Sequence, residues 1–146
     1  MRFKVAVAVA VAALSVGFAG LAIGQDSPIP ARQEIMKMNG ASMKLVGDMV
    51  KGTTEFDATK AADAMKIIAD NMPDFPALFP PGSEEGDTKA GPAIWTDMAG
   101  FTAASQKLVA DATEAQAAAA EGLAAFSPAF QAVGANCGGC HKVYRE

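Results

Sequence analysis

Four stretches of the sequence repeat apolar residues at helical spacing, and this pattern constrains the fold more than any other feature. The first spans residues 30–51, where Pro30 suits the first turn of a helix. The second spans residues 57–72, begins with Asp57 as a cap and stops before Pro73. The apolar faces of these two helices consist of Met36, Met43, Val46 and Val50, flanked by Ile35, Leu45 and Met49, and of Ala61, Ala64, Met65, Ile68 and Met72.

The other two periodic stretches lie in the second half of the chain. Pro92 opens a helix over residues 92–120 that is apolar at Ile94, Met98, Phe101, Leu108, Val109 and Ala112. Ser127 and Pro128 form a helix-start pair for the last stretch, which runs to Tyr144 with Phe130, Val133, Cys137, Cys140 and His141 on one face. No strand pattern or repeat competes with these helices. The sequence therefore predicts an all-α fold, an antiparallel four-helix bundle.

Residues 73–91 separate the second helix from the third and hold four of the eight prolines. Such a segment cannot form a helix or a central strand. A loop of this length in a small domain is usually functional or disordered. Phe75, Leu78 and Phe79 indicate that its first half packs against the bundle.

The N-terminus has the pattern of a secretory signal peptide over residues 1–24. Arg2 and Lys4 give it a positive start, an uncharged apolar stretch follows, and small residues precede Gln25. The alternative is an uncleaved membrane anchor, because the apolar stretch is just long enough to span a bilayer. Cleavage is favoured, which leaves residues 25–146 as an exported domain, located in the periplasm and without a stable membrane anchor.

The exported domain is acidic. Without Arg2 and Lys4, ten basic side chains face sixteen acidic ones, a net charge of −6. This balance argues against nucleic acid as a partner, since a phosphate backbone is bound by clustered cations.

Both cysteines and the one histidine lie in five consecutive residues, Cys137-Gly138-Gly139-Cys140-His141. C-x-x-C-H is the attachment sequence of a c-type haem. Two thiols at this spacing reach the two vinyl groups of the porphyrin and form thioethers, and the next residue directs an imidazole to the iron. The two glycines leave room for the porphyrin edge beside the backbone. The motif predicts one covalently bound haem c.

Three other interpretations of the motif remain open. A thioredoxin-like thiol-disulfide enzyme would place C-x-x-C at the start of a helix after a strand, whereas here it falls in the last turns of a helical chain. A structural zinc site would need a fourth ligand. A disulfide between Cys137 and Cys140 would leave the adjacent histidine unexplained. No nucleophile with a base points to catalytic turnover, so an enzyme is not expected.

At these residues the chain resembles the class II c-type cytochromes, the family of cytochrome c-prime and cytochrome c556. Residues 129–145 (AFQAVGANCGGCHKVYR) resemble the last helix of that family, residues 75–97 its long loop and third-helix entry, and residues 32–40 (RQEIMKMNG) its first helix. The resemblance implies a four-helix bundle with the haem motif near the C-terminus. It also implies that Cys137 and Cys140 bind the haem covalently and that His141 is the proximal iron ligand.

The same resemblance singles out Arg32 and Met36, which match the family's R-x-x-x-[ML] pattern. It implies that Met36 faces the distal side of the iron. One helical turn separates the two residues, so a methionine over the iron leaves the Arg32 guanidinium near the ring edge, where the propionates need a cation. The alternative is that Met36 is ordinary core packing. Met38 and Met43 are weaker candidates for the distal position.

The resemblance implies an electron carrier with one haem c, ligated by His141 and Met36, that exchanges single electrons with a redox partner protein of unknown identity. The alternative is a five-coordinate cytochrome c-prime that binds NO or CO at an open distal site. Members of the family often dimerise through their first two helices, so a homodimer is compatible with the resemblance.

Overall fold

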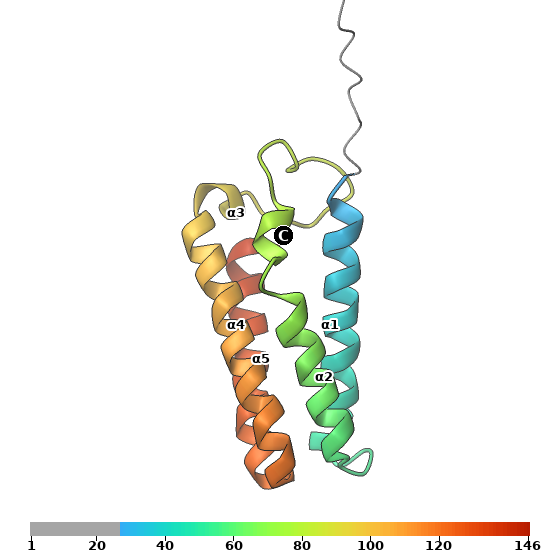
Figure 1. Ribbon diagram of the computed structural model, residues 1–146. Helices are drawn as coiled ribbons and strands as arrows, with labels where there is room; N and C mark the ends of the chain where they lie inside the picture. Colours follow the sequence, from blue (N-terminus) through green and yellow to red (C-terminus); the bar gives the residue numbers. More distant parts are fainter. Residues whose placement is uncertain (1–26) are drawn as a thin grey trace, which may run out of the picture.

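Four long helices form the body of the protein, whose structure is a computed structural model that describes residues 27–146 (Figure 1). They are α1 (Ile29–Val50), α2 (Ala58–Asn71), α4 (Met98–Ala118) and α5 (Leu123–Tyr144). Three short helices lie between them: η1 (Phe75–Leu78), α3 (Ala93–Thr96) and η2 (Ala119–Glu121). The predicted all-α bundle is confirmed. The predicted signal peptide lies outside the described residues.

The first two helices begin and end within one residue of the predicted positions. Pro30 stands in the first turn of α1. The Asp57 carboxylate accepts a hydrogen bond from the Lys60 amide at 3.0 Å, which confirms Asp57 as the cap of α2. Val46 and Met49 are buried on the inner face of α1, but Leu45 is 44% exposed.

The third predicted helix is broken, so the expectation of one helix over residues 92–120 was wrong. After the single turn of α3, Asp97 leaves helical geometry with φ −135° and ψ 54°. Its carboxylate accepts a hydrogen bond from the Gly100 amide at 3.1 Å and caps a new helix, α4. Aspartate favours such a cap because its short side chain reaches the free amides of the first turn.

The last helix begins at Leu123, so the prediction that it starts at Ser127 and Pro128 was also wrong. Gly122 adopts φ 94°, a left-handed conformation suited to glycine, and this turns the chain into α5. Pro128 then lies inside the helix, where a proline usually costs about 3 kcal/mol. The added turn fully buries Phe126, which stacks on Phe130 at 5.8 Å and offsets part of that cost.

The loop before α3 packs closely on the bundle, as predicted, but it includes the 3₁₀ turn η1, which the sequence analysis had excluded. Phe75 and Phe79 are buried and Leu78 is half-buried. Their rings belong to an upper aromatic cluster, which comprises Phe75, Phe79, Trp95, Phe101 and Tyr144.

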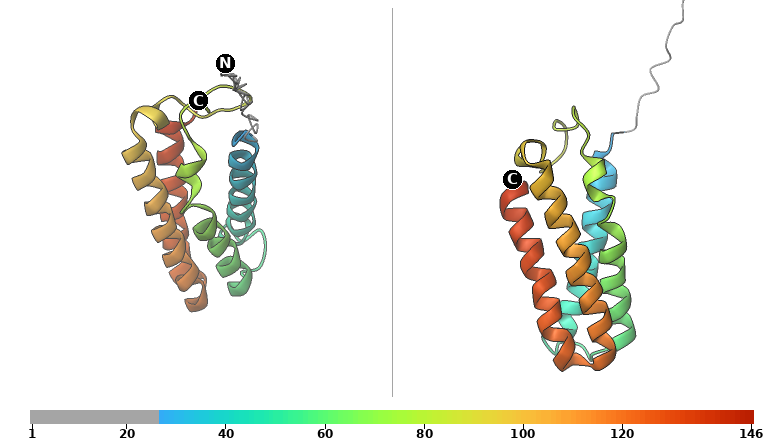
Figure 2. Two further views of the ribbon diagram at one scale, coloured as in Figure 1. Left: turned by 45° about the horizontal axis from the view of Figure 1, so that its top comes forward. Right: turned by 60° about the vertical axis from the view of Figure 1, so that its left-hand side comes forward.

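The four long helices do not contact one another equally. The start of α1 and the end of α5 lie at the same end of the bundle, so these two helices are antiparallel (Figures 1 and 2). Long seams join α1 to α2, α2 to α4 and α4 to α5, whereas α1 and α5 touch at few places. The bundle is therefore least closed between α1 and α5. Within residues 27–146, no helix is both long and apolar enough to cross a bilayer.

Candidate functional site

The C-x-x-C-H motif occupies the last turns of α5, where helical geometry places its side chains on two neighbouring faces. Cys137 and Cys140 are half-buried and pack against the core, and no disulfide joins them. His141 is exposed. A Cβ added to Gly138 or Gly139 would meet no atom within 4 Å, so open space lies beside both glycines.

The electrostatics of the motif keep both thiols protonated at neutral pH. Burial raises the pKa of Cys137, and burial together with the neighbouring Cys137 raises the pKa of Cys140. A thiol-disulfide enzyme needs the opposite shift, because the thiolate is its nucleophile. Partial burial lowers the pKa of the His141 imidazole, and the nearby Arg145 guanidinium lowers it further. A neutral imidazole is the form that can donate electrons to a metal.

Two contacts define how α1 and α5 are aligned. A Cβ on Gly47 would lie 3.9 Å from Cζ of Phe130, and a Cβ on Gly134 would lie 3.7 Å from Cε of Met43. From the first contact to the second, the position moves four residues back along α1 and four residues forward along α5, as expected for antiparallel helices. Each helix advances about 1.5 Å per residue, so this alignment can be continued toward the open end of the pair.

Continuing the alignment brings the predicted axial residues to one level. Met36 is seven residues before Met43, and His141 is seven residues after Gly134. Seven residues make two turns within about 20°, so Met36 shares the face of Met43, and His141 shares the face of Gly134. This extrapolation predicts that Met36 and His141 lie at one level, on the sides of α1 and α5 that border the least closed part of the bundle. By the same alignment Gly40 lies at the level of Cys137, and a Cβ on Gly40 would also meet no atom within 4 Å.

Contacts outside the motif fix the end of α5. The buried Tyr144 packs edge-on against Phe101 with 5.1 Å between ring centroids, and its hydroxyl donates to the Asp97 carboxylate at 2.9 Å. The Gly91 amide donates to the Tyr144 carbonyl at 2.9 Å, and the Glu146 amide donates to the Lys89 carbonyl at 3.0 Å. Sequence analysis assigned no role to Asp97. Its place three residues before Gly100 was the available signal, because an aspartate at this spacing is typical of a cap.

Arg32 is 4% exposed and lies near the start of α1, where its side chain contacts the long loop before α3. Its Nε donates to the Leu78 carbonyl at 2.8 Å, and its two terminal nitrogens donate to the carbonyl and the hydroxyl of Ser83. The guanidinium also lies 4.0 Å from the centroid of the Phe79 ring and 5.6 Å from that of Trp95. Three of its five N–H groups are engaged in this way, which leaves two that can bind another acceptor.

A second polar link joins α4 to α5 one residue before the motif. The Asp111 carboxylate accepts hydrogen bonds from Lys107 at 2.8 Å and from the Asn136 amide group at 3.1 Å. Burial acts to raise the pKa of Asp111, but the hydrogen bonds from Lys107 and Asn136 outweigh burial, so the pKa lies below its usual value. The carboxylate therefore remains charged and holds Asn136 in place beside Cys137.

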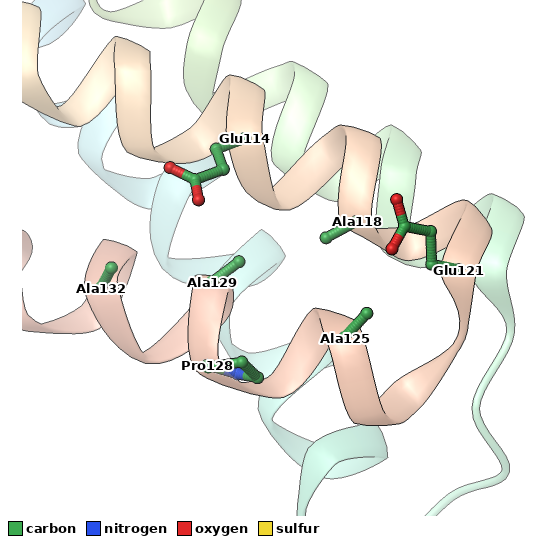
Figure 3. A pocket seen from close by; sticks show the side chains of 7 residues that line it. All are labelled: Glu114, Ala118, Glu121, Ala125, Pro128, Ala129 and Ala132. Atoms are coloured by element: carbon green, nitrogen blue, oxygen red, sulfur yellow. The ribbon is translucent and has the colours of Figure 1, made fainter.

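Two shallow hollows follow the seam between α4 and α5. One borders the motif and is lined by Gly139, Cys140, Tyr144 and the facing residues Gly100 and Ala104, among others. The other lies toward the opposite end of the seam (Figure 3), where the last turns of α4 and η2 face the first turns of α5. Its lining consists of Glu114 and Glu121 and of the small apolar residues Ala118, Ala125, Pro128, Ala129 and Ala132. This lining provides no thiol or imidazole, so the motif is the stronger candidate for a haem site.

Comparison with known proteins agrees with this placement of the site. A family model described as Cytochrome C' matches residues 27–145, almost the whole of the described chain. The chain belongs to the cytochrome c' family. It is a c-type cytochrome, and its cofactor is a covalently attached haem c.

Two relatives and two solved structures illustrate the similarity of this cytochrome to known ones. A cytochrome c' of Rhodopseudomonas palustris is 36% identical over 146 residues, which cover 99% of this chain and 97% of that protein. A solved structure of cytochrome c' from Rhodopseudomonas palustris superimposes with a TM-score of 0.79 over 84% of this chain and 98% of that chain. A cytochrome c-556 of Agrobacterium tumefaciens is 38% identical over 117 residues, 80% of this chain and 95% of that protein. A nitric oxide complex of a mutant cytochrome c prime from Alcaligenes xylosoxidans is 31% identical, with a TM-score of 0.72 over 82% of this chain and 94% of that chain.

The residues of the site fit a covalently held haem in this cytochrome. Two unpaired thiols lie one turn apart, with open space beside Gly138 and Gly139. The side chains near them are largely apolar, as a porphyrin requires. The imidazole and the thioether are the ligand types found in c-type cytochromes, and they lie on facing helices.

Proposed function

We propose that this cytochrome is an exported carrier of single electrons, in which Cys137 and Cys140 hold the haem by thioethers and His141 and Met36 are the axial ligands of the iron. The haem supplies the one-electron redox couple. Each residue in this proposal has a distinct task. The two thiols hold the ring against α5, His141 donates from α5, and Met36 donates from α1 across the opening between the two helices.

The alignment of α1 with α5 is the observation that carries the proposal. Met36 is half-buried, shares the face of Met43 and lies at the level of His141. Met38 lies on another face of α1 and is 38% exposed, so it does not border the opening between α1 and α5. Met43 lies beside Gly134, in the part of α1 and α5 where the two helices are in contact. Among these three methionines, these observations support Met36 as the distal ligand.

The surroundings support a role for Arg32 beside the cofactor. Arg32 precedes Met36 by one turn, is buried, and keeps two N–H groups free after binding the loop. We propose that these groups face the propionates, where a cation offsets negative charge.

Lys37 and Lys44 form ion pairs with Glu34 and Asp48 on their own helix, so they contribute little free charge for docking a partner.

Export to the periplasm is part of the same proposal. Residues 1–24 carry the signal-peptide pattern, and residues 27–146 form the domain that would be released. The expected partner is a redox protein, because an electron carrier must be reduced by one protein and oxidised by another. A homodimer is compatible with this function.

A gas-binding protein with an open distal site is the second candidate. One relative of this fold is described as a nitric oxide complex of a mutant cytochrome c prime. In this chain that function would require Met36 to lie beside the iron without binding it. Both candidates use the same cysteines and histidine, so the distal side decides between them.

The absorption spectrum of the ferric and ferrous protein, with and without CO, tests the proposal. If the Met36 sulfur is bound, the ferrous protein is low-spin and takes up CO slowly, because a ligand must first leave. Met36→Ala then gives a high-spin spectrum and rapid uptake of CO. Met43→Ala is the matched control: it should keep the coordination of the iron and cost only packing, about 2 kcal/mol for a half-buried side chain. An unaltered protein that is high-spin and binds CO at once would replace the carrier with the gas-binding alternative.

A further inference from the structure

The His141 ring lacks the usual support of a metal-bound histidine. Such a ring normally donates its second N–H to a carboxylate or carbonyl, which fixes the ring plane. Within residues 27–146, no side-chain hydrogen bond or ion pair involves the His141 ring. Its orientation therefore depends on the position of the helix turn that carries it.

That turn is at the end of a helix, where chains usually fray. Here packing in the upper aromatic cluster and a hydrogen bond hold the end of α5 against the start of α4. Tyr144, three residues after His141, is 8% exposed, and its hydroxyl donates to the Asp97 carboxylate at 2.9 Å. The His141 carbonyl accepts the Arg145 amide at 3.1 Å, so the same turn is closed by a backbone bond.

Asp97 is a fixed acceptor because two donors hold it. One carboxylate oxygen accepts the Gly100 amide at 3.1 Å and the other accepts the Tyr144 hydroxyl. The absence of a side chain at position 100 makes room for this arrangement, since a Cβ there would lie 2.6 Å from the hydroxyl oxygen of Tyr144 and closer still to the Asp97 carboxylate. The start of α4 and the end of α5 are thus joined at one carboxylate.

We propose that Tyr144 and Asp97 are positioning residues for His141: their hydrogen bond fixes the last turn of α5 and through it the plane of the imidazole. The proposal rests on the assignment of His141 as an axial ligand. It adds that the orientation of the ligand is set by the packing of α5 on α4 rather than by a side chain bonded to the ring. Tyr144 and Asp97 need not touch the cofactor to do this.

Tyr144→Phe in the haem-loaded full chain tests the proposal, because it keeps the ring that packs on Phe101 and removes only the hydroxyl. Two measurements are needed. Amide hydrogen exchange at residues 141–145 should become roughly tenfold faster when the charge-assisted bond is lost. The paramagnetically shifted methyl resonances of the ferric haem, whose spread depends on the orientation of the axial imidazole, should move or broaden.

Ser127→Ala is the matched control, because Ser127 also donates a hydroxyl hydrogen bond on α5, to the Leu123 carbonyl at 2.8 Å. It should leave the methyl resonances unchanged. Asp97→Asn is a second variant that keeps the cap on Gly100 and weakens the acceptor for Tyr144. It should shift the same resonances, and it decides the question if Tyr144→Phe fails to assemble.

Methyl resonances that match those of the unaltered protein would overturn the proposal, whether or not exchange becomes faster, because Tyr144 would then stabilise the helix end alone. The proposed function fails in a different way. If His141→Ala leaves the spectrum unchanged, or if the unaltered protein holds no covalent haem, then His141 is not the ligand and the earlier assignment falls first.

Discussion

Arg32 illustrates what one residue contributes to two parts of this protein. Its guanidinium is buried among carbonyl oxygens and aromatic rings, and no ion pair with a carboxylate is formed within residues 27–146. Burial lowers the pKa of Arg32 and the charge of Glu84 acts in the opposite direction, but a guanidinium remains charged at any physiological pH. The residue thus holds the long loop against α1 and supplies a buried positive charge, without a direct ion pair, near the proposed haem.

Replacing Arg32 separates these two contributions. Arg32→Leu should lower the free energy of unfolding by about 3 kcal/mol, because two buried carbonyls and the Ser83 hydroxyl lose a charged donor. It should also lower the reduction potential, since the loss of a nearby cation favours ferric iron. Urea unfolding and a redox titration measure the two effects.

Arg32→Lys is the control for the charge, because lysine keeps the cation and cannot reproduce the planar set of donors. It should lose much of the stability and keep most of the potential. Gln33→Ala, which removes one exposed hydrogen bond to the Asp87 carbonyl, should change neither quantity by much. A potential that Arg32→Leu leaves unchanged would put the guanidinium outside the influence of the iron.

At the scale of elements, local sequence patterns predicted what depends on neighbouring residues. The apolar spacing and the Asp57 cap placed α1 and α2 within a residue, and C-x-x-C-H identified the cofactor. The break at Asp97 had a local signal in the cap on Gly100, but the hydrogen bond that Asp97 accepts from Tyr144 comes from 47 residues away, and the early start of α5 depends on the burial of Phe126. The proposed alignment of Met36 with His141 likewise rests on contacts between helices. Such long-range packing leaves no periodic signal in a single sequence.

The link between α4 and α5 at Asp111 gives a prediction for one pair of elements. Asp111→Ala should lower the free energy of unfolding at pH 7 by about 1 kcal/mol, because Asn136 and Lys107 lose their acceptor. The pKa of Asp111 is lowered in the folded protein from its ordinary value of 3.8. Its contribution is therefore complete above about pH 4 and is lost as the pH falls through the lower, folded pKa.

The difference between Asp111→Ala and the unaltered protein should consequently shrink at pH 3 and below. Urea unfolding of both proteins at pH 7 and in acid measures it. Asp111→Asn is the matched variant, since an amide still accepts from Asn136 but carries no charge to titrate. A difference that stays constant over this pH range would mean that the carboxylate contributes by packing and not by its charge.

For the whole molecule, we propose that the N-terminal segment directs export of the bundle. Residues 1–24 are expected to be removed during export, so protein released from the cell envelope should begin at Gln25 or within a few residues of it. N-terminal sequencing of the envelope fraction measures this. Arg2→Glu combined with Lys4→Glu should retain the longer precursor inside the cell, because the positive start is needed for export. A chain that begins at Met1 in the membrane fraction would indicate an uncleaved anchor.

From the shape of the bundle we expect its stability to depend on the cofactor. Three of the seams between long helices are extensive, whereas α1 and α5 touch at few places beyond Met43 and Gly134. In the proposed holoprotein the porphyrin fills this opening and connects the two helices. A chain without it would have poorly packed apolar walls on α1 and α5, and an unfilled void costs about 24 cal/mol per Å³.

Replacing both Cys137 and Cys140 by alanine tests this dependence. Acidic organic solvent should then extract all of the haem, because no thioether remains, and the thermal midpoint should fall well below that of the unaltered protein. Cys137→Ala alone is the control: one thioether remains, so the haem should stay covalently bound and most of the stability should be kept. Both outcomes can be read from a haem stain on a denaturing gel and from a melting curve. Haem that resists extraction from the double variant would contradict the attachment site, and an unchanged midpoint in a haem-free double variant would show that α1 and α5 close on each other without the ring.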